Sequence, residues 1–206
     1  MYGGSYGYPL VLSERAGSGT GLEFGSVDLV VGNSPKKDRL LFGLGLRRPV
    51  IARKGRFIVL FVGSLAAFWA LGFVVYPMIS DPSRLADAEF VQLNLANLIG
   101  ALIYAFIQTS LSEEIFFRGF LGKRLIAKLG FGWGNLIQAA VFGALHAVLM
   151  YRMIGAVKAG VIMLYTGTIG WMIGYLNERE AEGSILPGWL LHALANLVSA
   201  LGTMLG

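Results

Sequence analysis

The sequence predicts an all-α protein, a polytopic transmembrane helix bundle of about five spans. Hydrophobic residues make up 55% of the chain and charged residues only 14%, which argues against a soluble globular domain. The apolar residues are gathered in runs close to the roughly 20 residues that a helix needs to cross a bilayer. At 206 residues, the length corresponds to one domain.

The N-terminal part differs in composition from the rest. Residues 1–38 are expected to be a flexible segment without assigned function, ahead of a membrane-embedded domain over residues 39–206. This segment is rich in Gly, Ser and Tyr and lacks the basic-then-apolar pattern of a signal peptide. Eight of the 17 basic residues lie between Lys36 and Arg56, directly before the first apolar run. That position fits anionic headgroups, so membrane lipids are expected partners and nucleic acid is not.

The first predicted elements set the topology. Leu40–Leu46 and the two arginines after it predict a short amphipathic segment on the membrane surface. The first span is expected over Phe57–Ile79, which carries no charge. An acidic turn with Asp81 and Glu89 follows, and the positive-inside rule places it outside. We therefore expect a multi-pass protein of the cell membrane with a cytoplasmic N-terminus.

Four further spans follow. A helical pattern without proline runs from Phe90 to about Leu129 and carries a polar stretch near its middle. The third span is expected from about Trp133 to Met150, and the fourth from about Met153 to Leu176. A charged loop, Asn177–Ser184, precedes the fifth span, which begins at Pro187, a favourable first helical position.

Ionisable residues inside these spans are the main indication of function. The only two histidines, His146 and His192, lie in predicted spans, and a third span carries Glu113, Glu114 and Arg118. A charged residue near a span centre costs at least roughly 2.5–3.5 kcal/mol. We therefore expect these side chains to face a common cavity, which the topology opens toward the cytoplasm. The chain has no cysteine, which excludes thiolate nucleophiles and zinc–thiolate sites.

The spacing of these residues indicates how they are arranged. Glu114 and Arg118 are four residues apart, so they share a helix face and can form an ion pair. The same spacing recurs in two further pairs, which are Phe142–His146 and His192–Asn196. Gln138 extends the helix face of Phe142 and His146 one turn back.

A carboxylate and imidazoles inside an apolar cavity have the parts needed to activate water. Glu113 can act as a general base, and an imidazole can orient the same water or accept a proton. A second imidazole and the Asn196 amide can donate hydrogen bonds to a developing oxyanion. Glu113, His146 and His192 can equally bind a zinc ion in the open three-ligand arrangement of a metalloendopeptidase, although the sequence has no local two-histidine metal motif.

Taken in order, three motifs resemble a known family. Glu113–Arg118 matches E-E-x-x-x-R, Phe142–His146 matches F-x-x-x-H, and His192–Asn196 matches H-x-x-x-N. On three separate spans, this series is similar to the type II CAAX prenyl endopeptidase and bacteriocin-processing family (CPBP or Abi). The resemblance extends from Gln108 to Leu201.

The resemblance implies an intramembrane endopeptidase with a four-helix catalytic core, which cleaves membrane-associated peptides, including prenylated CAAX-type proteins, near the C-terminus. It implies that Glu113 and His146 activate water and that His192 and Asn196 stabilise the oxyanion. Glu114 and Arg118 brace the site, and Phe142 forms a cavity wall. We expect no required cofactor, with zinc as the alternative. The alternative function is a non-proteolytic membrane protein that confers immunity by sequestering a bacteriocin or another peptide.

Overall fold

The computed structural model describes residues 40–79 and 87–205. None of these described residues lies in a strand, and helices account for most of them. The expected flexible segment 1–38 and most of the expected acidic turn lie outside the described residues.

Three helices are long and apolar enough to cross a membrane, which confirms the predicted helical membrane bundle. The first comprises α2 (Lys54–Val75) and a 3₁₀ turn, η1 (Tyr76–Met78). The last is α6 (Leu186–Leu205), which carries Pro187 in its first turn. Between them runs a continuous helical stretch of 86 residues, Leu95–Glu180.

Two glycines divide this long stretch. At about 1.5 Å per residue, 86 residues would extend far beyond a bilayer core of roughly 30 Å. Gly130 and Gly155 have φ angles of +74° and +80°, which glycine adopts without the steric cost that a Cβ brings. The chain reverses at both positions, giving helical segments over residues 95–129, 131–154 and 156–180. Together with α2 and α6 they make five segments, close to the predicted boundaries.

The first of the three segments is irregular. It contains α3 (Leu95–Ile103), the π-helix η3 (Tyr104–Thr109), α4 (Ser110–Glu113) and the π-helix η4 (Glu114–Gly122). It begins five residues after the predicted start, because the side chain of Asn94 accepts a hydrogen bond from the Asn97 amide and caps the helix there. The remaining elements are α5 (Lys123–Tyr175) and a π-helix, η5 (Leu176–Glu180), which extends the fourth span into the predicted loop.

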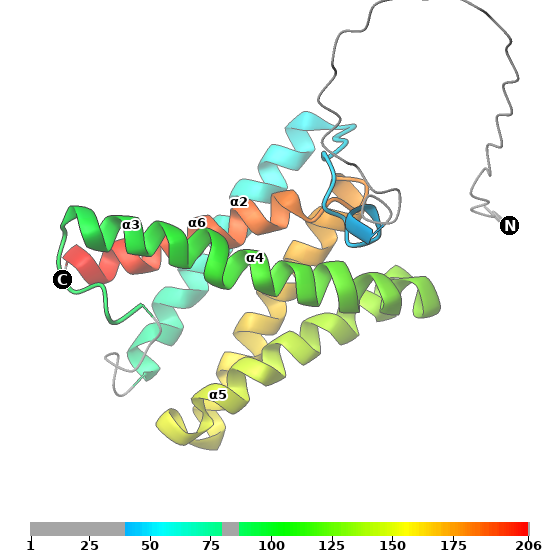
Figure 1. Cartoon of the computed structure of the whole chain (residues 1–206). Helices are drawn as coiled ribbons and strands as arrows, with labels where there is room; N and C mark the ends of the chain where they lie inside the picture. Colours follow the sequence, from blue (N-terminus) through cyan, green and yellow to red (C-terminus); the bar gives the residue numbers. More distant parts are fainter. Residues whose placement is uncertain (1–39, 80–86, 206) are drawn as a thin grey trace, which may run out of the picture. The chain divides into compact units, whose positions relative to one another are not determined.

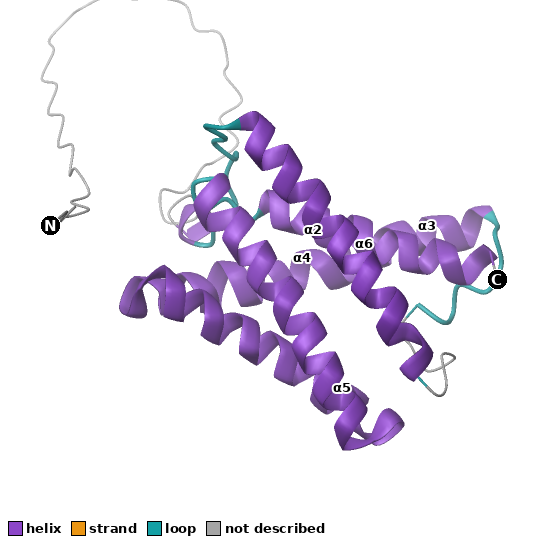
Figure 2. Ribbon diagram, turned by 180° about the vertical axis from the view of Figure 1, so that it is seen from behind, coloured by secondary structure: helices purple, strands orange, loops and turns teal. Residues whose placement is uncertain are grey.

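Helix α6 lies beside the α3–η3–α4 segment, as Figures 1 and 2 show, and it also contacts α2 and α5. The indole nitrogen of Trp189 on α6 donates to the Phe106 carbonyl of η3 at 2.7 Å. An apolar cluster of Ile169, Ile173, Leu176 and Leu191 packs the fourth segment against α6. These contacts bring the motif-bearing helices together.

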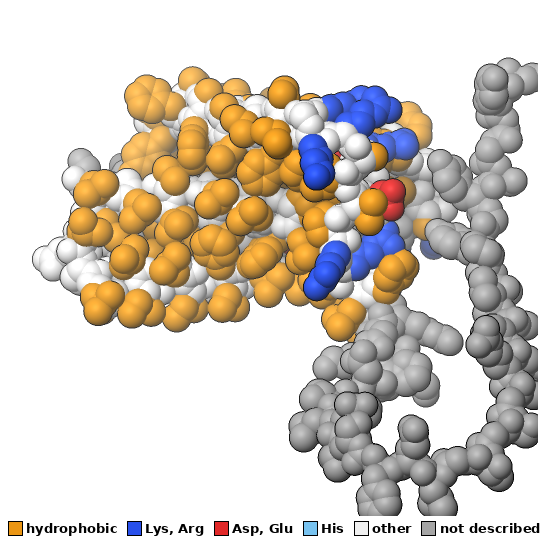
Figure 3. All heavy atoms as spheres, turned by 90° about the horizontal axis from the view of Figure 1, so that it is seen from above, with side chains coloured by type: hydrophobic (Ala, Val, Ile, Leu, Met, Phe, Trp, Pro, Cys, Tyr) orange, Lys and Arg blue, Asp and Glu red, His pale blue; other side chains and the backbone are white. Residues whose placement is uncertain are grey.

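The outside of the bundle is apolar, as a bilayer requires. Large hydrophobic side chains such as Phe73, Val157 and Leu164 are strongly exposed. In Figure 3, hydrophobic side chains cover most of one face, and Lys and Arg side chains gather toward one end of it. A broad apolar surface with a basic end is typical of a membrane-embedded bundle.

One end of the bundle joins three segments that the predicted topology places in the cytoplasm. The Ile185 amide donates to the Gly45 carbonyl at 3.0 Å, and the Ser184 hydroxyl donates to the Arg47 carbonyl at 2.6 Å. Lys123, at the start of α5, donates to the Gly183 carbonyl at 2.7 Å. The basic entry segment, the Lys123 region and the turn before α6 therefore lie on the same side, as the predicted order of spans requires.

Candidate active site

A buried carboxylate at the start of η4 links two of the motifs. Glu114 is fully buried, and its Oε1 lies 2.9 Å from Nη1 of Arg118 and 3.2 Å from Nδ1 of His192. Since Arg118 is always protonated, the carboxylate beside it is an acceptor and the His192 Nδ1–H donates to it. That bond leaves Nε2 of His192 facing away from Glu114.

Arg118 is held from its other side by an aromatic ring. Its guanidinium carbon lies 4.4 Å from the centroid of the Phe142 ring, and the residue is only 3% exposed. The Phe142 ring also packs edge-on against Phe117 and stacks in a tilted arrangement on His146. Phe142 also lies edge-on to the His192 ring, so it contacts the supporting cation and both imidazoles, in addition to forming a wall.

Glu113 is paired with His192. Its Oε2 lies 3.8 Å from Nε2 of His192, a distance longer than a direct hydrogen bond. The Glu113 side chain is 30% exposed, but Oε2 itself is buried and has no hydrogen-bond partner among the described residues. The family resemblance implied that Glu113 acts with His146, whereas the imidazole that the structure places beside Glu113 is that of His192.

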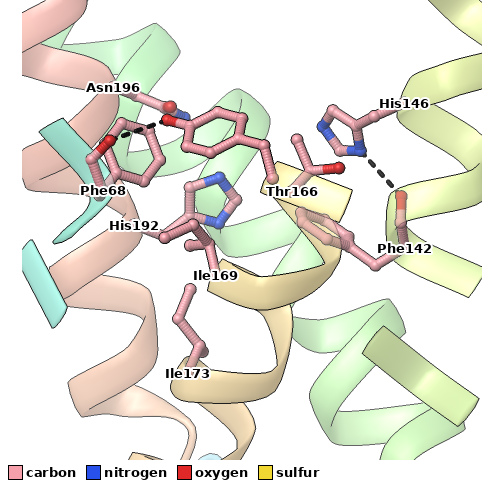
Figure 4. A pocket seen from close by; sticks show the side chains of 9 residues that line it. Phe68, Phe142, His146, Thr166, Ile169, Ile173, His192 and Asn196 are labelled. Carbon is pink, nitrogen blue, oxygen red and sulfur yellow. Dashed lines mark hydrogen bonds between the residues drawn. The ribbon is translucent and has the colours of Figure 1, made fainter. Parts of the chain in front are cut away.

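His146 lies on the 131–154 segment and faces a cavity of about 200 Å³. Its Nδ1 lies 2.9 Å from the Phe142 carbonyl, which only accepts, so Nδ1 carries a hydrogen, and in the neutral imidazole Nε2 keeps its lone pair. Figure 4 shows this bond, with His192 and Asn196 in the same cavity. The structure thus brings His146, His192 and Asn196 to one space, while Glu113 adjoins it through His192.

Asn196 lies one turn after His192 on α6 and is tied to the beginning of α4. Its Nδ2 donates to the Thr109 hydroxyl oxygen at 3.0 Å and to the Ser110 hydroxyl oxygen at 3.2 Å. Thr109 donates its own hydrogen to the Tyr104 carbonyl at 2.9 Å, so it can only accept from Asn196. An oxyanion would therefore have to replace one of these two hydroxyls as the acceptor.

The rest of the cavity wall is mainly apolar and comes from α2 and the fourth segment. These residues do not stand out in the sequence, because uncharged side chains in a span look like ordinary packing residues. Tyr165 is fixed by a hydrogen bond of 3.0 Å to the Phe68 carbonyl. The lining residues that the motifs missed are Phe68, Tyr165, Thr166, Ile169 and Ile173.

The residues present do not fit a three-ligand zinc site. Such a site needs Glu113, His146 and His192 to converge on one point. Within residues 40–79 and 87–205, no three His, Asp or Glu side chains are grouped closely enough to hold a metal ion.

The fold and the site define a multi-pass helical membrane protein with a buried carboxylate–imidazole cluster. Residues 95–198, half of the chain, match a family described as type II CAAX prenyl endopeptidase Rce1-like. The chain belongs to this family of CAAX-type intramembrane proteases, which confirms the resemblance seen in its motifs. Comparisons with curated proteins and with solved structures found no match.

Proposed function

We propose that this protein hydrolyses a peptide bond near the C-terminus of a membrane-associated peptide, with a prenylated CAAX-type C-terminus as the first candidate substrate. The observation that carries the proposal is the 3.8 Å separation between Oε2 of Glu113 and Nε2 of His192. Both atoms are acceptors when Glu113 is ionised and His192 is neutral with its hydrogen on Nδ1. One water molecule can donate to two acceptors at this distance, and such a water would be held beside the cavity.

In the proposed reaction, the water oxygen attacks the scissile carbonyl carbon while Glu113 accepts a proton. The carbonyl oxygen becomes the oxyanion, for which the Asn196 amide is the proposed donor. Glu113 then returns the proton to the leaving amine nitrogen as the carbon–nitrogen bond breaks. His146, with Nε2 free, is the proposed second partner of the water or the leaving group.

The cavity also supports a lipid-modified or strongly apolar substrate. Phe68, Ile169 and Ile173 contribute apolar side chains to its lining. We propose that peptide or lipidated protein is the substrate, that the protein needs no cofactor, and that Glu114 and Arg118 position His192.

Cleavage by the purified full chain in detergent tests the proposal. Two synthetic peptides with the same C-terminal sequence, one prenylated and one unmodified, are incubated with the protein, and the products are identified by mass spectrometry. We expect a single cut near the C-terminus. Peptide that is bound but never cut, whichever form is offered, would replace the proposal with the sequestering function.

A second test concerns orientation in the cell membrane. We propose that the N-terminus is cytoplasmic, because the basic entry segment and Lys123 both bond to the turn before α6, at one end of the bundle. Reporter fusions after Arg84 and after Gly206 are both expected to report the outer side, and a fusion after Gly130 the cytoplasm. A cytoplasmic signal from either of the first two would contradict this topology.

A further inference from the structure

A second, much smaller cavity lies against Arg118, whose guanidinium also packs on Phe142 in the wall of the larger cavity. Its volume is about 10 Å³, and it shares no lining residue with the larger cavity. Three of its polar wall residues come from three different helical elements: Arg118 from η4, Gln138 from α5 and Asn177 from η5. The remaining lining residues are Gly122, Ile126, Asn135, Gly174 and Glu178.

Two amides at this cavity each have one unused polar atom, and their orientations are fixed. Nε2 of Gln138 donates to the Gly170 carbonyl at 3.1 Å and to Oδ1 of Asn135 at 2.9 Å, which leaves Oε1 as an unpartnered acceptor. Oδ1 of Asn177 accepts from the Gly188 amide at 2.8 Å, which leaves Nδ2 as an unpartnered donor. A backbone carbonyl only accepts and a backbone N–H only donates, so neither amide can be flipped.

Arg118 contributes further unpartnered donors. Its Nε, Nη1 and Nη2 are buried and make no aligned hydrogen bond with the described residues, although Nη1 lies within ion-pair distance of Glu114. Gln138 and Asn177 are at most 1% exposed. Buried polar groups are nearly always hydrogen-bonded to protein or to ordered water, because an unmade bond is costly. Oε2 of Glu114, which pairs with Arg118, is also unpartnered. However, Oε1 of Gln138 and Nδ2 of Asn177 have no hydrogen-bond partner among the described residues, so a bound molecule can supply the missing bonds.

Size and chemistry together indicate water. A cavity of roughly 10–15 Å³ holds one water molecule, provided that it offers two to four polar partners. The Arg118 and Asn177 donors match the lone pairs of a water, and Oε1 of Gln138 matches one of its hydrogens. An anion would be repelled by that oxygen and by the Glu178 carboxylate, and a cation would be repelled by the Arg118 guanidinium.

A glycine keeps room for this arrangement. A Cβ on Gly174 would overlap Oδ1 of Asn135 and lie 3.0 Å from Nε2 of Gln138. The amide pair that aims the Gln138 oxygen therefore depends on the absence of a side chain at this position.

We propose that this cavity binds one ordered water molecule, which bridges Arg118, Gln138 and Asn177. Gln138 and Asn177 are then positioning residues: through the water they hold Arg118, which holds Glu114 and so His192. The existence of the water is independent of the proposed function, whereas the positioning role rests on it.

An experimental structure of the full chain, at a resolution that shows water, tests whether the water is bound. We expect density for one water within hydrogen-bond distance of Arg118, Gln138 and Asn177. In Gln138→Met, which has a similar volume but no amide, this density should be lost. A dry cavity in the wild-type chain, or density that fits an ion, would overturn the proposal.

Kinetics test the positioning role. Gln138→Met is expected to lower kcat roughly 10–100-fold through misplacement of His192, with KM unchanged because Gln138 does not line the substrate cavity. The matched control is Gln108→Leu, at an exposed residue of η3, which should keep both constants.

Should Gln138→Met fail to fold, Asn177→Asp serves in its place. The new carboxylate still accepts a hydrogen bond from the Gly188 amide. Its negative charge attracts Arg118 away from Glu114, so the same loss of kcat is expected. Wild-type kcat in a folded variant that lacks the water would overturn the positioning role. A wild-type chain that cleaves no peptide would remove the proposed function and this role with it, while the density would still decide whether the water is bound.

Discussion

Glu113→Gln is expected to lower kcat for peptide hydrolysis by about 10²–10⁴-fold, the range typical for removal of a general base. The amide has the shape of the carboxylate but cannot accept a proton from water. Because the Glu113 side chain is 30% exposed and makes no ion pair with Arg118, the melting temperature should change little. Cleavage of the peptide by purified variant and wild-type protein, together with a thermal unfolding curve for each, measures both effects.

Glu89→Gln is the matched control, since Glu89 is exposed and lies before the first residue of α3. It should leave both kcat and the melting temperature unchanged. If Glu113→Gln cleaves the peptide at nearly the wild-type rate, Glu113 is not the base, and the Nε2 atom of His146 becomes the candidate to examine.

The sequence was sufficient to predict the parts of the site that depend on local spacing. A spacing of four residues along a helix brings Glu114 next to Arg118, and Oε1 of Glu114 lies 2.9 Å from Nη1 of Arg118. The high cost of polar groups in a membrane also made it predictable that His146 and His192 would meet inside the bundle. Both follow from rules that need no knowledge of neighbouring helices.

The partners across helices could not be predicted in the same way. The π-helices η3 and η4 shift the faces of the segment that carries Glu113, and their i→i+5 bonding is set by packing rather than by an apolar repeat. Spacing along one helix therefore could not show which of the two imidazoles lies beside Glu113. Thr109 and Ser110 were missed because a hydroxyl in a span usually bonds to its own helix.

The position of Gln138 shows that a shared helix face does not guarantee a shared cavity. The sequence placed it one turn before Phe142 on the face of His146, and all three do lie on the same helical segment. However, Gln138 borders the small cavity behind Arg118, while Phe142 and His146 line the large one. A helix face one turn away can serve a different site when an arginine separates the two.

Glu114→Ala is expected to lower the free energy of unfolding by about 3–5 kcal/mol, because it leaves the guanidinium of Arg118 buried without its carboxylate. The side chains of Glu114 and Arg118 are 0% and 2% exposed, so solvent does not replace the lost partner. His192 also loses the acceptor of its Nδ1–H, so peptide hydrolysis should fall together with stability. Denaturant unfolding in detergent measures the first effect and peptide cleavage the second.

Glu180→Ala provides the comparison for a pair that water can reach. The Glu180 side chain is only 8% exposed, but its partner Arg56 is 46% exposed, lies 3.0 Å away and keeps a hydrogen bond to Tyr175, so the loss should be at most about 1 kcal/mol. An equal loss in the two variants would mean that the Glu114–Arg118 pair is hydrated and does not brace the site.

The double variant Glu114→Leu with Arg118→Met separates stability from positioning. Replacing a buried ion pair with apolar side chains of similar volume is often neutral or stabilising, so much of the lost unfolding free energy should return. Hydrolysis should not return, because His192 still lacks the carboxylate that fixes its Nδ1–H. A double variant that regains both stability and hydrolysis would show that the pair serves folding alone, since the catalytic role requires the carboxylate itself and not merely a well-packed interior.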